Sequence, residues 1–359
     1  MLGLKPGWLL WALRAAAFLL ALSFIAARLL VYWDLNFISR TAYWVASLWM
    51  GILLFVFMFC LITHVLSGIL HITPLKHFLE ATVRFDSGRI LFAIVVLGSL
   101  ILSCFSLYQA RCKVQVTDLE IPVKGTSSDL DGFTIVQISD VHLGIIVHQE
   151  RMEQIVREIN SLNPDIVFIT GDLMDENADR LLEVADSIRH LKTRFGLFAV
   201  TGNHEYYAGA EQIIKHASEI GLRFLTNEKV VLPNGLILYG FNDPTSAQFG
   251  QQIVPFERVI GSEAQYSPAV LLYHQPRLFE KAAMLNVDLM LSGHTHKGQI
   301  WPLEYISRLI YPYQTGHFVI GKSHLYVSRG IGTWGPPMRL NSPPELVRIR
   351  LRIANKNNA

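Results

Sequence analysis

The sequence contains little cysteine, and none of it in the last two thirds of the chain. Of 359 residues only Cys60, Cys104 and Cys112 are cysteine. The residues that follow therefore have no thiol for a disulfide or a zinc-thiolate site. A metal ion bound there must be held by nitrogen and oxygen.

Charge is also scarce and nearly balanced. Charged residues make up 17% of the chain, and 31 Lys and Arg against 29 Asp and Glu leave a formal net charge of +2. This balance provides no basic field that would neutralise a phosphate backbone, so we expect no nucleic-acid partner. The mean hydropathy of +0.32 is too high for an ordinary soluble protein, which indicates that part of the chain lies in lipid.

Three long apolar stretches come before residue 110, at residues 8–33, 43–71 and 90–108. Each has about the 20 residues that a helix needs to cross the hydrocarbon core of a bilayer. The first contains Arg14 and is too long for the usual cleaved signal peptide. We therefore predict a multi-pass membrane protein with an anchor of three transmembrane helices at residues 1–112 and a second domain at residues 113–359.

The positive charges beside these stretches predict which side of the membrane the second domain occupies. The second loop carries Lys76, Arg84 and Arg89 and the N-terminus carries Lys5, whereas the first loop has only Arg40, against Asp34. This distribution favours placing the N-terminus and the second loop in the cytoplasm. Three spans then put the second domain outside the cytoplasm. Arg28, Arg111 and Lys113 favour the opposite orientation, and a re-entrant stretch would place the domain in the cytoplasm.

From about Lys113 onward, short β-rich apolar runs alternate with amphipathic windows, the pattern of an α/β layered domain. The windows at residues 150–162 and 178–191 have apolar residues at helical spacing and predict two core-facing helices.

Six of the apolar runs have the length of a strand and end in polar residues, at residues 134–138, 166–169, 197–200, 236–239, 270–273 and 288–291. In an open α/β sheet, ligands bind beyond the carboxyl ends of the strands. The residues that follow five of these runs supply the candidate site: Asp140, His142, Asp172, Asn203, His204, His274, His294 and His296.

These residue types indicate a metal centre. Asp140 and His142 would project to the same side of an extended segment, and His294 and His296 repeat that spacing. Carboxylate, amide and imidazole ligands without thiolate suit Mn, Fe or Zn, and two such ions can clamp a displacement at phosphorus. Asp172, alone in its motif, could bridge the ions by presenting one oxygen to each.

In this order the segments resemble the calcineurin-like metallophosphoesterase family, whose pattern is Asp-x-His, Gly-Asp, Gly-Asn-His-Asp/Glu, a lone His and Gly-His-x-His. The resemblance covers roughly residues 133–349, and the tail from Leu325 to Glu345, with Arg339, is similar to the membrane-associated branch of that family. It implies a four-layer fold in which a β-sandwich is flanked by helices on both outer faces.

The resemblance also implies roles for single residues. It assigns one metal ion to Asp140, His142, Asp172 and His296, and the second ion to Asp172, Asn203, His274 and His294. His204 would act on the phosphate without binding metal, oriented by Glu205 or Asp175. Lys297 departs from the family pattern, and it could bind a phosphate or simply point to solvent.

The function expected is hydrolysis of a phosphomonoester or phosphodiester by a hydroxide bridging two divalent metal ions. The membrane anchor suggests a lipid-linked substrate. Two alternatives stay open: pyrophosphate cleavage of a nucleotide-linked lipid precursor, and a catalytically silent membrane protein that only binds. The apolar segment at residues 301–318 could contact lipid or pack under a loop.

Overall fold

The computed structural model describes residues 7–72, 87–125 and 127–353. The chain divides into two compact units, one of residues 1–111 and 335–338 and the other of residues 112–334 and 339–359. The domain limits expected from the sequence stay a prediction, because a compact unit is not by itself an independently folding domain.

Three helices in the described part of the first unit are long and apolar enough to cross a membrane, as expected: α1 (Trp8–Trp33), α2 (Phe37–Ile72) and α4 (Ser87–Arg111). Helix α2 begins earlier than predicted because Asn36 caps it. The Asn36 Oδ1 accepts hydrogen bonds from the backbone N–H groups of Ile38 (2.9 Å) and Ser39 (3.0 Å).

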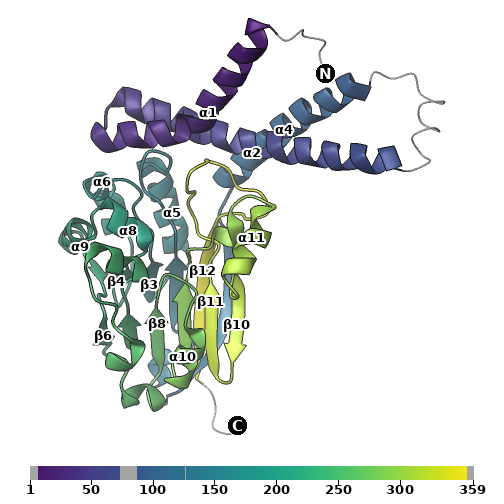
Figure 1. The fold of residues 1–359 in the computed structure, drawn as a ribbon. Coiled ribbons are helices and arrows are strands. Elements are labelled where there is room, and N and C mark those ends of the chain that lie inside the picture. The colour runs from purple at the N-terminus through teal and green to yellow at the C-terminus, as the bar shows by residue number, and fades with distance from the viewer. Residues whose placement is uncertain (1–6, 73–86, 126, 354–359) are drawn as a thin grey trace. The chain divides into compact units, whose positions relative to one another are not determined.

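Two six-stranded sheets form the centre of the second unit (Figure 1). The first sheet has the order β1 (Gln115–Val123), β12 (Glu345–Ile353), β2 (Thr134–Ile138), β3 (Ile166–Thr170), β4 (Leu197–Val200) and β5 (Leu222–Phe224). The second has the order β10 (Gly316–Ile320), β11 (Ser323–Val327), β9 (Leu289–Ser292), β8 (Ala269–Leu272), β7 (Ile237–Gly240) and β6 (Glu228–Val231).

Seven α-helices and five short 3-10 helices are described in the second unit. The α-helices are α5 (Gln149–Ser161), α6 (Arg180–Glu183), α7 (Ala185–Arg189), α8 (Asn203–Ala208), α9 (Ala210–Glu219), α10 (Phe279–Met284) and α11 (Leu303–Ile310). The 3-10 helices are η1 (Ser128–Leu130), η2 (Pro244–Phe249), η3 (Phe256–Arg258), η4 (Ser262–Gln265) and η5 (His296–Gly298).

Three hydrophobic clusters hold these elements in four layers, which confirms the expected architecture. One cluster packs α5, α6, α7 and α9 on the outer face of the first sheet. The second fills the space between the sheets, where side chains such as Phe168 and Leu291 meet. The third packs α10, η3 and η4 on the outer face of the second sheet.

All six predicted strands are observed, with each end within one residue of the prediction. The helix predicted at residues 150–162 is α5, but the continuous helix predicted at residues 178–191 is wrong. The chain forms α6 and α7 there, separated at Val184, whose φ of −104° and ψ of 5° lie outside the helical range. Apolar periodicity reports which side chains are buried, and it does not require an unbroken helix.

Strands β2, β3 and β4 run parallel to one another, and so do β7, β8 and β9 in the other sheet. Their carboxyl ends therefore gather at one edge of each sheet, and the polar residues that follow them are brought into reach of one another.

Candidate metal centre

The structure brings the candidate ligands from both sheets together. Side-chain nitrogen and oxygen atoms form three groups in which all atoms lie within 4.8 Å of one another: Asp140 with His142 and His296, His142 with Asp172 and His204, and Asp172 with His274 and His294. Five strand ends, separated by up to about 150 residues of sequence, thus converge on one cluster.

A single oxygen of Asp172 connects the two halves of this cluster. Asp172 Oδ2 lies 3.1 Å from His274 Nε2 and 3.9 Å from His142 Nε2. The other oxygen, Oδ1, accepts a hydrogen bond from the backbone N–H of His204 at 2.9 Å. From the sequence, each oxygen of Asp172 could bind one ion. In the structure Oδ2 faces both halves of the cluster, whereas Oδ1 is occupied by the backbone N–H of His204.

Imidazole nitrogens face one another in each half. His142 Nε2 and His296 Nε2 are 3.0 Å apart, and His294 Nδ1 and His274 Nε2 are 3.2 Å apart. His296 Nε2 also lies 3.4 Å from Asp140 Oδ1. Two ring nitrogens at such distances must share either a proton or a cation, because their lone pairs otherwise repel.

Five of the seven expected ligands have backbone conformations that are rare for residues other than glycine. Their φ angles are positive: 54° at Asp140, 52° at His142, 52° at Asp172, 71° at His294 and 48° at His296. The prediction that Asp140 and His142 share one side of an extended segment is therefore wrong, because tight left-handed turns orient both. Each such turn costs on the order of 1–3 kcal/mol, and strain of this kind concentrates at functional sites.

Two glycines allow the strand ends to approach this closely. A Cβ atom on Gly202 would lie 2.1 Å from Asp172 Oδ1, and one on Gly293 would lie 2.3 Å from Asp140 Oδ2. Any larger residue would displace a candidate ligand.

Partners outside the cluster orient the histidine rings. Thr170 O accepts from His274 Nδ1 at 2.7 Å, which leaves Nε2 with its lone pair directed at the cluster. On two further rings, Tyr311 Oη lies 2.6 Å from His294 Nε2 and Arg339 Nη2 lies 3.3 Å from His296 Nδ1. Sequence reasoning did not find these three partners, although it noted Arg339 as a feature of the tail.

His204 is oriented by Asp175, one of the two carboxylates considered from the sequence. His204 Nδ1 lies 2.8 Å from Asp175 Oδ1. Glu205 has another task, since it accepts hydrogen bonds from the backbone N–H groups of Asp172 (2.9 Å), Met174 (3.0 Å) and Gly202 (2.6 Å). Burial opposes a charged His204, but the nearby carboxylates of Asp172 and Asp175 outweigh it and raise the pKa of His204 to about 9.

The same balance of burial and charge acts on the candidate ligands. Burial lowers the pKa of His294 to about 3, and the neighbouring His274 contributes to that lowering. Burial would raise the pKa of Asp172, but His274 and His204 outweigh this effect and hold it well below its usual value. The carboxylate of Asp172 is thus held in the ionised form that binds cations.

The donor set fits divalent metal ions. Asp140, His142, Asp172, His274 and His296 are buried, and only nitrogen and oxygen donors face the cluster. Among the described residues, Asn203 Oδ1 is a buried oxygen without a hydrogen-bond partner. Such an oxygen is costly unless it binds something, and an amide oxygen suits a metal ion of this kind.

The ammonium group of Lys297 is held by the protein. Lys297 Nζ donates to Asn341 O at 2.9 Å and lies 3.7 Å from Glu304 Oε2. Its predicted contact with substrate phosphate stays a prediction.

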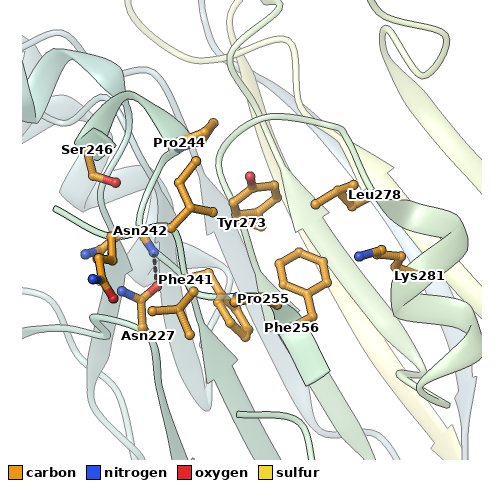
Figure 2. A pocket seen from close by; sticks show the side chains of 13 residues that line it. Asn227, Phe241, Asn242, Pro244, Ser246, Pro255, Phe256, Tyr273, Leu278 and Lys281 are labelled. Carbon is orange, nitrogen blue, oxygen red and sulfur yellow. Dashed lines mark hydrogen bonds between the residues drawn. The ribbon is translucent and has the colours of Figure 1, made fainter. Parts of the chain in front are cut away.

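A separate cavity of about 160 Å³ lies beyond the ends of β7 and β8 (Figure 2). Tyr273, Phe256 and Lys281 line it, whereas His274, the neighbour of Tyr273, lies in the metal cluster. Tyr273 and His274 directly follow β8, and the chain there directs Tyr273 to the cavity and His274 to the cluster. None of the seven expected ligands lines the cavity.

Comparison with known proteins shows which family this chain belongs to. Residues 133–298 match the family model described as calcineurin-like phosphoesterase. An uncharacterized metallophosphoesterase of Aquifex aeolicus is 35% identical over 266 residues, which cover 73% of this chain and 98% of the relative. The chain belongs to the calcineurin-like phosphoesterase family. This membership supports the enzyme class expected from the sequence, a metal-dependent hydrolase of phosphoric esters.

Other relatives of this phosphoesterase are longer than the region they share with it. A transmembrane protein with metallophosphoesterase domain from Danio rerio is 32% identical over 287 residues, covering 77% of this chain and 65% of the relative. Among solved structures, TT1561 of Thermus thermophilus aligns with 55% of this chain and 88% of its own, at 14% identity and a TM-score of 0.38.

In this phosphoesterase we expect Asp172→Asn or His296→Ala to lose bound metal and nearly all hydrolysis, because a two-ion site that loses its bridge or a ligand cannot hold both ions. Elemental analysis of detergent-purified protein measures the metal directly. The matched controls are Asp129→Asn and His190→Ala, whose side chains are exposed. Full metal content in either site variant would refute the ligand assignment.

Proposed function

We propose that this chain is a membrane-anchored phosphoesterase whose cluster holds two divalent metal ions and hydrolyses a phosphate ester. One ion would be held by Asp140, His142, Asp172 and His296, and the other by Asp172, Asn203, His274 and His294. The observation that carries this proposal is Asp172 Oδ2, which faces an imidazole nitrogen of each half. The donor set favours Mn, Fe or Zn without selecting among them.

Such ions, when bound, would neutralise phosphoryl oxygens and lower the pKa of bound water. The chain's own residues supply the proton chemistry. With Nδ1 of His204 beside Asp175, its Nε2 is the nitrogen left to act on substrate. We assign His204 the role of protonating the leaving oxygen, with Asp175 fixing the ring as the carboxylate of a catalytic triad does.

His204→Ala should keep its metal ions while kcat falls by about 10² to 10⁴, the contribution of one general acid. Paired measurements of metal content and turnover separate this role from that of a ligand. If metal is lost together with activity, His204 binds an ion instead.

A lipid-linked substrate is supported by the surface of α11. The apolar side chains of Tyr305, Ile306, Leu309 and Ile310 lie on one side of this helix and are exposed, Leu309 by 88%. The residue that α11 buries is Glu304, at 8% exposure, whose Oε2 accepts a hydrogen bond from Asn341 Nδ2 at 3.2 Å. This arrangement is the reverse of a helix on a soluble protein, and it suits contact with the apolar part of a lipid.

Replacing Leu309 and Ile310 together by Ser should lower kcat/KM by about 10- to 100-fold on a substrate embedded in vesicles, because two apolar contacts are lost. Turnover of a soluble aryl phosphate should be unchanged. The control is the pair Tyr266→Ser and Met284→Ser, whose side chains are also exposed but lie outside α11. Equal losses on both substrates would show that the two residues serve only the fold.

We further propose that the phosphoesterase domain faces the extracytoplasmic side. The support is the basic residues beside the candidate spans, which favour the N-terminus and the second loop in the cytoplasm. Helix α4 ends at Arg111 and β1 begins at Gln115, so the domain follows the last candidate span directly.

Single cysteines test this placement after the three native cysteines have been removed. Ser218→Cys on α9 is suitable because Ser218 is exposed, and Ser87→Cys marks the start of α4. An impermeant thiol reagent on intact cells should label position 218 and not position 87. The reverse pattern would place the domain in the cytoplasm.

A further inference from the structure

An arginine lies at the rim of the metal cluster. Arg277 follows His274 by three residues in the loop after β8, and its side chain is exposed. Its guanidinium carbon lies 5.0 Å from the centre of the Tyr311 ring, within the range of a cation–π contact. This contact holds the cation in place without neutralising its charge.

The charge of Arg277 is available to a ligand. Within the described ranges, no carboxylate lies within the 4.0 Å of an ion pair with Arg277. Lys297, the cation expected from the sequence, differs because Asn341 O and Glu304 occupy its ammonium group. An arginine that is held on an aromatic ring and has no acidic partner is well suited to bind an anion through its fork of N–H donors.

Two contacts connect Arg277 with the candidate ligands. Arg277 stacks on Tyr311, and Tyr311 Oη lies 2.6 Å from His294 Nε2. Tyr311 also directly follows Ile310, the last residue of α11. Tyr311 therefore connects the Arg277 cation with the metal cluster and with the end of α11.

We propose that Arg277 binds a second phosphate group of the substrate, next to the phosphate that is cleaved. This inference rests on the proposed phosphoesterase function and narrows its substrate class to an amphiphilic diphosphate. Its scissile phosphate would lie at the cluster, the other phosphate at Arg277 and the apolar chain along α11.

The reaction is a hydrolysis and requires no other reactant than water. The water oxygen forms a bond to the scissile phosphorus, and the bond from that phosphorus to the bridging oxygen breaks. His204 donates a proton to the bridging oxygen, which leaves on the second phosphate, and one proton of the attacking water restores His204. Arg277 compensates the remaining charge of the second phosphate.

The test compares dodecyl diphosphate with dodecyl monophosphate, using the full-length protein in detergent. Arg277→Gln should lower kcat/KM for the diphosphate by about 10- to 100-fold, the effect of losing a hydrogen bond between charged groups. Turnover of the monophosphate should change little, and Arg277→Lys should recover part of the loss. A soluble methyl diphosphate should show the same dependence on Arg277, which separates this residue from α11.

Arg352→Gln is the matched control. Strands β12 and β2 are antiparallel, and Arg350 of β12 pairs with Thr134, the first residue of β2. Arg352 comes two residues later in β12, so it is at the end of the sheet opposite to Asp140, which lies beyond the last residue of β2. Its salt bridge with Glu120 is exposed and contributes little to stability.

Calorimetric binding of imidodiphosphate and of inorganic phosphate gives a readout that does not need turnover. Arg277→Gln should weaken the binding of imidodiphosphate selectively. Equal losses on mono- and diphosphates, or a selective loss in Lys297→Gln and not in Arg277→Gln, would overturn the assignment of Arg277. If the wild-type protein hydrolyses neither substrate, the proposed hydrolysis fails, and the binding measurement still decides the role of Arg277.

Discussion

The fixed position of the Asp172 carboxylate is the constraint on which the rest of the site depends. One oxygen is held by the backbone N–H of His204, and the other faces both His142 and His274. Glu205 adds a second connection, because it accepts hydrogen bonds from the backbone at Asp172 and at Gly202. The end of β3 and the start of α8 are thereby held together, and the remaining candidate ligands are arranged around a preorganised carboxylate.

Much of this site could be predicted because its ligands follow apolar runs of strand length. The alternation of buried runs with polar ends indicates where Asp140, Asp172 and His274 leave the sheets, and parallel strands bring such ends together. The left-handed backbone at Asp140 and His142 could not be predicted, since it opposes the local preference of both residues. Only the surrounding fold can impose it, so the information lies in tertiary contacts.

The residues that orient the candidate ligand histidines could not be predicted from the sequence either. Arg339 reaches His296 across 43 residues of sequence, and Tyr311 reaches His294 across 17. Neither spacing is a motif, and composition cannot report such contacts. The apolar character of residues 301–318 was visible in the sequence, but whether it was buried was not. In α11 the apolar side chains of Ile306 and Leu309 are exposed, whereas Tyr313 and Phe318 pack against the third hydrophobic cluster.

Electron paramagnetic resonance of the protein loaded with Mn²⁺ tests the proposed metal centre most directly. Two ions bridged by Asp172 would lie about 3.5 to 4 Å apart, close enough for their spins to couple. The expected result is two manganese ions per chain and the spectrum of an exchange-coupled pair. One ion per chain, or two ions with the spectrum of isolated Mn²⁺, would contradict a centre bridged by Asp172.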